Sequence, residues 1–174
     1  MTEIGAVIWK WIEGAALWFF SIFCRILHKD RSKEADEAFL QFVKFGLVGV
    51  SNTVVHYSIY LVSLMFMQSA GLFPKWDYII ATATAFFISV LWSFFWNNKF
   101  VFTIEEGERR SLFRALIKTY ISYSFTGLFL NSILMLLWVQ VFHISEYIAP
   151  ILNLVISVPI NFLINKFWAF KKER

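Results

Sequence analysis

Long apolar stretches, separated by short charged ones, dominate this chain. Four of them cover about 45–67, 78–96, 119–142 and 147–164, and none contains a formal charge apart from the titratable His56. A helix needs about 20 mostly apolar residues to cross a bilayer. Because lipid satisfies no backbone polar group, such runs must form helices or a closed barrel, and these are too long and too continuously apolar for barrel strands. The pattern predicts an all-α membrane protein with four transmembrane helices.

A fifth apolar stretch, from Ile4 to Leu27, is interrupted by Lys10, Glu13 and Arg25. Its longest charge-free run covers only residues 14–24, which is short for a span. We expect an amphipathic helix in the membrane interface, with its tryptophans at headgroup depth, and a fifth span is the alternative. Glu13 and the lack of a cleavage site count against a signal peptide. The predicted domains are therefore an interfacial helix with a charged linker (1–38) and a four-helix membrane domain (39–174).

Composition agrees with this reading. Of 174 residues, 59% are hydrophobic and 16% are charged, whereas soluble proteins have roughly 25% charged residues. The single cysteine, Cys24, can form neither an internal disulfide nor a metal-binding pair. A soluble enzyme and a disulfide-stapled secreted domain are therefore disfavoured.

The basic residues indicate the orientation. Of the 16 lysines and arginines, all but Lys75 flank the predicted spans on one side. By the positive-inside rule, both termini and the central loop are expected on the cytoplasmic side of the cytoplasmic membrane. The net charge of +4 then reports orientation and attraction to anionic lipids rather than nucleic-acid binding.

The ends of the second and fourth spans resemble each other. Ser93–Phe102 and Asn161–Phe170 share the pattern Ser/Asn-Phe-x-x-Asn-x-x-x-x-Phe, and the span entries Phe42–Lys44 and Leu116–Lys118 match more weakly. Each unit holds two spans, so both copies run in the same direction as a parallel repeat. A common membrane interface explains the shared aromatic and basic residues, but less easily an Asn at the same offset from each terminal Phe.

Polar residues recur every four positions inside the spans, so each helix carries one polar stripe. Asn is costly in hydrocarbon unless it faces protein or water. Two readings stay open: the stripes hold helices together through bonds of less than about 1 kcal/mol each, or they line a hydrated groove suited to a sugar. The predicted groove residues are Asn52, His56, Asn97, Asn131, Asn153, Asn161 and Asn165.

Four lysines stand where the stripes approach the predicted cytoplasmic surface: Lys44, Lys99, Lys118 and Lys166. As point-charge donors they suit a phosphate, although snorkelling to anionic lipid is the alternative for each. The spans contain no Asp or Glu, and the chain has no phosphate-binding glycine loop, no metal-spaced cluster and no nucleophile with a base. We therefore expect neither an enzyme nor a bound cofactor.

Three motifs together resemble the GtrA family of small four-span bacterial membrane proteins. They are Phe42–Gly49 followed by Asn52 and Thr53, then Trp96–Phe102, then Asn161–Phe170, and the resemblance covers about residues 39–171. The residues that match the family motifs are Lys44, Gly49, Asn52, Thr53, Asn97, Phe102, Asn161, Asn165, Lys166 and Phe170.

The resemblance implies translocation of a polyprenyl-phosphate-linked monosaccharide across the cytoplasmic membrane, for cell-surface polysaccharide or teichoic acid glycosylation. A separate glycosyltransferase, which loads the lipid, is the implied partner. The alternative is a non-transporting anchor or partner subunit of that glycosyltransferase. Because four helices make a thin bundle, we also expect a homo-oligomer.

Overall fold

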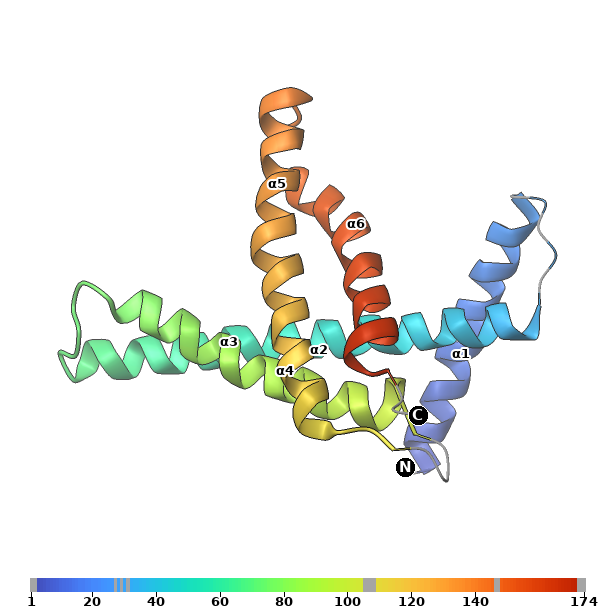
Figure 1. The fold of residues 1–174 in the computed structure, drawn as a ribbon, viewed down its shortest axis with the longest axis horizontal. Helices are drawn as coiled ribbons and strands as arrows, with labels where there is room; N and C mark the ends of the chain where they lie inside the picture. Colours follow the sequence, from blue (N-terminus) through green and yellow to red (C-terminus); the bar gives the residue numbers. More distant parts are fainter. Residues whose placement is uncertain are drawn as a thin grey trace. The chain divides into compact units, whose positions relative to one another are not determined.

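The structure, a computed structural model, describes residues 3–26, 28, 30, 32–104, 109–145 and 148–171. These residues are helical apart from short connections, which confirms the all-α class (Figure 1). Several residues that bear on the predicted topology lie outside the described residues. They are Tyr147, where the predicted fourth span starts, the acidic residues Glu105, Glu106, Glu108 and Glu146, and the basic residues Lys29, Arg31, Lys172 and Arg174.

The chain forms two compact units, Met1–Leu47 and Val48–Arg174. The first unit contains α1 (Glu3–Ile26) and the beginning of α2 (Lys33–Ser69). Ser32 caps α2, since its Oγ accepts from the backbone N–H of Ala35 at 3.2 Å. Within this unit the Phe20 and Phe39 rings stack at 4.5 Å. The boundary between the units lies inside α2, and the predicted boundary at residue 38 stays a prediction.

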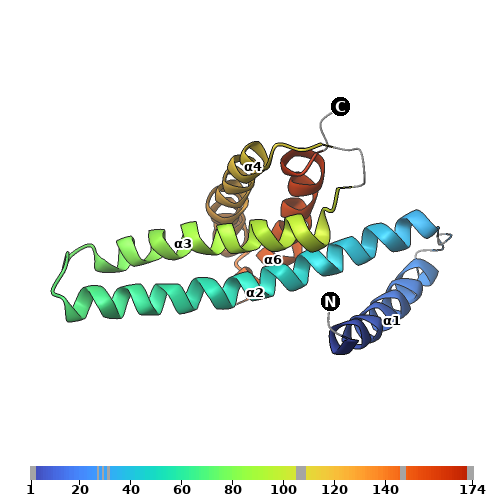
Figure 2. The ribbon, with the colours of Figure 1, turned by 90° about the horizontal axis from the view of Figure 1, so that it is seen from below.

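The second unit contains the rest of α2 and three further helical runs, in which turns of π-helix, labelled η, alternate with α-helix. The runs are α3 (Asp77–Trp96) with η1 (Asn97–Val101); α4 (Leu112–Ser124) with η2 (Phe125–Leu130), α5 (Asn131–Leu136) and η3 (Leu137–Val141); and α6 (Ala149–Ile164) with η4 (Asn165–Ala169). Figure 2 shows the second half of α2 lying beside α3.

Among the residues that the structure describes, five helices are long and apolar enough to cross a membrane: Val7–Ile26, Lys33–Ser69, Asp77–Val101, Leu112–Val141 and Ala149–Ala169. The last four cover most of each predicted span, and the first, which is part of α1, is the candidate for the alternative fifth span. The helical run that holds most of the predicted span 119–142 begins at Leu112, because the helix continues past the apolar stretch into a segment containing Arg114 and Lys118.

The helices of the second unit pack through small and polar side chains. Ala81, Ala85, Ser89 and Ser93 are buried along one face of α3, whereas large residues such as Phe87 are exposed. This arrangement is typical of membrane helices, in which small residues allow close approach and large apolar ones face lipid. The α2 and α3 helices are linked by His56 Nδ1 and Ser89 Oγ at 3.2 Å and by Trp92 Nε1, which donates to Ser51 Oγ at 3.2 Å.

Candidate functional site

A network of polar side chains, here called the polar junction, joins α3–η1, α4 and α6–η4. Its members are Ser93, Asn97, Ser122, Tyr123, Asn161 and Asn165. On the α3 side, Asn97 Nδ2 donates to Ser93 Oγ at 3.0 Å, and Ser93 Oγ lies 2.5 Å from Tyr123 Oη. The network thus ties the end of α3 to α4.

The other half of the polar junction joins α4 to α6. Ser122 Oγ donates to Asn161 Oδ1 at 2.9 Å, and Asn165 Nδ2 donates to Ser122 Oγ at 3.0 Å and to the Asn161 carbonyl at 2.8 Å. Neighbouring side chains on a helix project about 100° apart. For this reason Ser122 and Tyr123, although adjacent in sequence, bind different helices.

Asn97 and Asn165 are fully buried, and each begins a π-helical turn. The backbone N–H of Phe102 donates to the Asn97 carbonyl at 2.8 Å, and that of Phe170 donates to the Asn165 carbonyl at the same distance. In both motifs the Phe follows the Asn by five residues, which is the spacing of a π-helical hydrogen bond. Turns of π-helix often occur at functional sites.

The terminal phenylalanines of the two motifs meet in one aromatic cluster. The Phe102 and Phe170 rings lie 4.6 Å apart, Phe94 contacts Phe170 at 5.6 Å, and Phe162 contacts Phe102 at 6.0 Å. Because Phe94 and Phe162 occupy matching positions of the two motifs, the contacts are reciprocal. Together the four rings bury the ends of α3–η1 and α6–η4 against each other.

Arg110 caps both of these helix ends. Its Nη1 donates to the Phe170 carbonyl at 3.0 Å, and its Nη2 donates to the Phe102 carbonyl at 2.8 Å and to Asn98 Oδ1. The guanidinium also lies over the Phe170 ring, 5.0 Å from its centroid. Desolvation lowers the pKa of Arg110, but a guanidinium remains charged in proteins. A cation at the C-termini of two helices stabilises their exposed carbonyls and dipoles.

The predicted phosphate-binding lysines lie in different surroundings. Lys44 belongs to the first unit and lies 5.0 Å from the Trp9 ring. Lys118 Nζ donates to the Trp168 carbonyl at 3.2 Å. The other two lie over rings near their own helix ends: Lys99 is 5.6 Å from Phe100 and Lys166 is 5.5 Å from Phe162. Each ammonium group thus lies over or beside a different aromatic residue.

The predicted groove residues fall into three places in the second unit. Asn97, Asn161 and Asn165 belong to the polar junction. Asn52 and His56 lie on α2, where His56 meets Ser89 of α3. In the third place Asn153 of α6 donates to Asn131 Oδ1 at 2.6 Å and to the Asn131 carbonyl at 3.2 Å. The structure therefore brings together Asn161 with Asn165, and Asn131 with Asn153.

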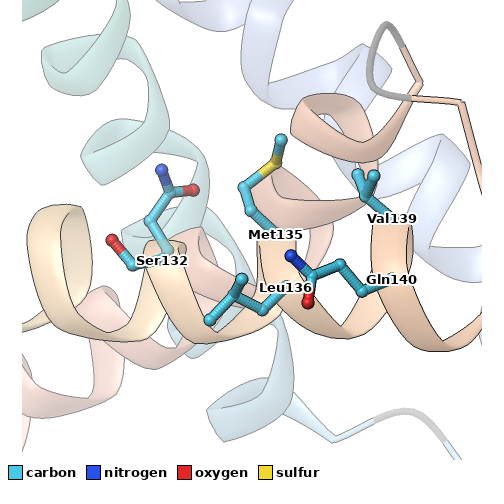
Figure 3. Close-up of a pocket in the computed structure, with 6 residues that line it drawn as sticks. Ser132, Met135, Leu136, Val139 and Gln140 are labelled. Carbon is cyan, nitrogen blue, oxygen red and sulfur yellow. The ribbon is translucent and has the colours of Figure 1, made fainter.

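Asn131 also lines a surface pocket of about 440 Å³ on α5 and η3. Ser132, Met135, Leu136, Val139 and Gln140 line the same pocket, and Figure 3 shows their side chains along one helix. The polar groups of this wall come from Asn131, Ser132 and Gln140. Among the described residues, no three His, Cys, Asp or Glu side chains lie close enough together to hold a metal ion.

Sequence reasoning did not select Ser122, Tyr123 and Arg110 as site residues. Ser122 and Tyr123 lie on the polar faces of their span, so periodicity gave a signal for both but did not reveal their partners. Arg110 has no pattern around it beyond the general excess of basic residues in its loop. Gln140, a polar residue near the end of an apolar run, is a signal that could have indicated the pocket.

Comparison with known proteins places the motifs in context. A family profile described as GtrA/DPMS, transmembrane domain, matches residues 44–170. The membrane protein YwcD of Bacillus subtilis is 27% identical over 74% of this chain and 94% of its own length. The cell wall teichoic acid glycosylation protein GtcA of Listeria monocytogenes is 29% identical over 58% of this chain and 68% of its own.

A longer relative also matches. The dolichol-phosphate mannosyltransferase of Pyrococcus furiosus is 31% identical over 74% of this chain, but over only 34% of its own length. No solved structure matches the chain. The family profile covers most of the chain and contains both π-helical exit motifs, so the chain belongs to the GtrA/DPMS transmembrane-domain family.

Proposed function

We propose that this protein moves a polyprenyl-phosphate-linked monosaccharide across the cytoplasmic membrane, for glycosylation of a cell-surface polysaccharide or teichoic acid. Family membership supports this proposal, as do two relatives' names, one a teichoic acid glycosylation protein and the other a dolichol-phosphate mannosyltransferase. Both names concern the attachment of sugars, and the second also names a lipid phosphate.

The observation that carries the proposal is the polar wall of the α5–η3 pocket. Asn131 is ten residues from Val141, the end of this helical run, which places it about 15 Å along the axis and near the middle of a core of about 30 Å. Gln140 lies next to the end. The wall therefore offers polar groups near mid-membrane, from Asn131 and Ser132, and again near one surface, from Gln140.

The chemistry and size of this pocket suit a sugar headgroup. An unpaired hydroxyl in hydrocarbon costs several kcal/mol, about 4–8 by transfer to an alkane, and amide groups can offset that cost. The pocket volume of about 440 Å³ lies within the range of small-molecule sites, roughly 300–1,000 Å³. The bond from Asn153 holds the Asn131 side chain in place.

The remaining functional assignments are part of the same proposal. Phosphate binding would fall to lysines at the cytoplasmic end, namely Lys99, Lys118 and Lys166 of the second unit and, as a separate candidate, Lys44 of the first. The other groove asparagines and His56 would provide further polar contacts. Matching π-turns and reciprocal phenylalanine contacts support a parallel two-helix repeat. Both termini would be cytoplasmic, and a second copy would close the open side of the pocket.

One observation favours the alternative, a membrane partner of a glycosyltransferase that does not itself transport. The match to the Pyrococcus mannosyltransferase covers only 34% of that protein. In that relative, a region similar to this chain is therefore joined to a much longer enzyme. The present chain could serve the same purpose as a separate subunit, with its polar stripes acting as helix or subunit interfaces.

Movement of undecaprenyl-phosphate-linked sugar in reconstituted vesicles tests the proposal. Wild-type protein should accelerate movement above empty vesicles, and Asn131→Leu or Gln140→Leu should slow it about tenfold, the effect of losing about 1.4 kcal/mol of hydrogen bonding. Thr82→Val is the matched control, because Thr82 is exposed and its hydroxyl donates within its own helix, to the Tyr78 carbonyl at 2.7 Å.

The outcomes separate the two functions. If wild-type protein moves no more lipid than empty vesicles, transport is refuted. Co-isolation with polyprenyl-phosphate glycosyltransferase activity in that case would support the partner role. If both leucine variants move lipid as fast as the Thr82→Val control, transport stands but the pocket is not its route.

A further inference from the structure

Helix α2 is longer than a membrane is thick. Its 37 residues, Lys33–Ser69, correspond to about 55 Å. The part from Phe45 to Ser69 contains no Lys, Arg, Asp or Glu and measures about 37 Å, enough for a core of about 30 Å with some tilt. The part from Lys33 to Lys44 carries five charged residues. This charged segment therefore extends about 18 Å beyond the span.

Helix α1 contacts α2 on this charged segment. Near one end of α1 the Trp9 ring lies 5.0 Å from Lys44 Nζ, and further along α1 the Phe20 ring stacks on Phe39. From Trp9 to Phe20 α1 advances about 16 Å, whereas α2 advances only about 7.5 Å from Phe39 to Lys44. The two helices therefore cross steeply instead of running side by side, as Figure 1 shows for this unit.

Much of the surface of α1 outside its contacts with α2 is apolar. Its large side chains are exposed: Trp11 at 77%, Trp18 at 60%, Phe19 at 64% and Phe23 at 57%. At 100° per residue, Lys10, Gly14, Ser21 and Arg25 fall in one narrow sector beside this face. A shallow pocket of about 530 Å³, lined by Lys10, Trp11, Gly14 and Ala15, lies where the two sectors meet. Trp and Phe on one face, with Lys and Arg on another, are features of interfacial helices.

We infer that α1 docks its aromatic face onto the cytoplasmic leaflet of the membrane that α2 crosses, with Trp9 held at the level of Lys44. Lys44 is the last charged residue before the span, so it marks the membrane boundary. Because α1 crosses α2 steeply at this level, it lies closer to the membrane plane than to the membrane normal. Lys10 and Arg25 then meet the lipid headgroups, and the chain crosses the membrane four times.

This assignment goes beyond the proposed transport function, because α1 lies outside the family-matched residues 44–170. The contacts between α1 and α2 within the first unit lie on the charged segment, at Phe39 and Lys44, before the uncharged part of α2 begins. The aromatic residues of α1 make it apolar enough by composition to count as a possible fifth span. In the inferred arrangement, these residues enter the interface between the headgroups and the acyl chains.

Cysteine labelling in oriented membrane vesicles tests the number of spans. In a Cys24→Ser background, Lys10→Cys and Lys75→Cys are each exposed to a membrane-impermeant maleimide. With four spans the two positions react from opposite sides, and with five spans they react from the same side. Reaction from the same side overturns the inference, whichever way the protein is oriented.

Spin-label depth tests the occupant of the aromatic face. In vesicles of phosphatidylethanolamine and phosphatidylglycerol, a nitroxide at Phe19→Cys should lie about 5–10 Å into the interface, accessible to oxygen. A nitroxide at Ser21→Cys should remain accessible to a water-soluble nickel complex. A Phe19→Cys label shielded from both reagents would show that protein, such as a partner enzyme or a second copy, covers this face, and would overturn the inference.

Discussion

Arg110 connects the ends of two helices through one guanidinium, so its removal should loosen the second unit. Arg110→Gln loses three hydrogen bonds, to the Phe102 and Phe170 carbonyls and to Asn98. Hydrogen bonds to a charged group contribute about 1.5–3 kcal/mol each when well shielded, and nearer 1 kcal/mol where water can replace them. Arg110 is only partly buried, so we expect the free energy of unfolding to fall by about 2–4 kcal/mol.

Unfolding by SDS in mixed micelles, followed by circular dichroism, measures this loss. Arg109→Gln removes the same charge from an exposed neighbouring position and should cost no more than about 0.5 kcal/mol. Arg110→Lys keeps the charge but lacks the planar fork that reaches two carbonyls, so it should lose more than half of the wild-type contribution. Equal losses for Arg110→Gln and Arg109→Gln would refute the capping role.

Three further predictions concern buried bonds and glycines, and the same unfolding assay measures them. Asn165→Leu should lower the free energy of unfolding by about 2–4 kcal/mol, because a fully buried amide loses its bonds and leaves acceptors unpaired; a loss below about 1 kcal/mol would contradict this. A double-mutant cycle of Ser93→Ala and Tyr123→Phe should give a coupling of about 0.5–1.5 kcal/mol, and no coupling would contradict their bond. Gly71→Ala should destabilise by about 1 kcal/mol because Gly71 has φ +62°, whereas Gly14→Ala, on an open helix surface, should stabilise by about 0.5–1 kcal/mol; effects of the same sign would contradict the backbone argument.

Apolar length and charge placement were enough to predict the helical class and the positions of long apolar helices, because they report whether a stretch of chain prefers lipid. The same signal does not give the start of the helix that holds the third predicted span, because hydropathy marks the membrane boundary near Thr119 whereas the helix begins at Leu112. The π-turns after Trp96 and Ile164 could not be foreseen, because their hydrogen bonds depend on how both helix ends are packed.

In the candidate site, too, some features follow from local sequence and others depend on packing between helices. A four-residue period placed Asn161 and Asn165 on one face of the α6–η4 run, where their side chains meet, because period is a local property of a helix. It could not show that Ser122 would bind them, or that Arg110 would cap two distant helix ends.

The sequence by itself determined which segments are apolar helices, and the repeated Asn and Phe spacing at two of their ends. Only the tertiary structure decided that this spacing closes π-turns, that the two terminal phenylalanines stack, and that α1 rests on the charged segment of α2. The physical reason is that hydropathy and periodicity depend on neighbours along one helix, whereas a buried polar side chain is satisfied by whichever helix packs against it.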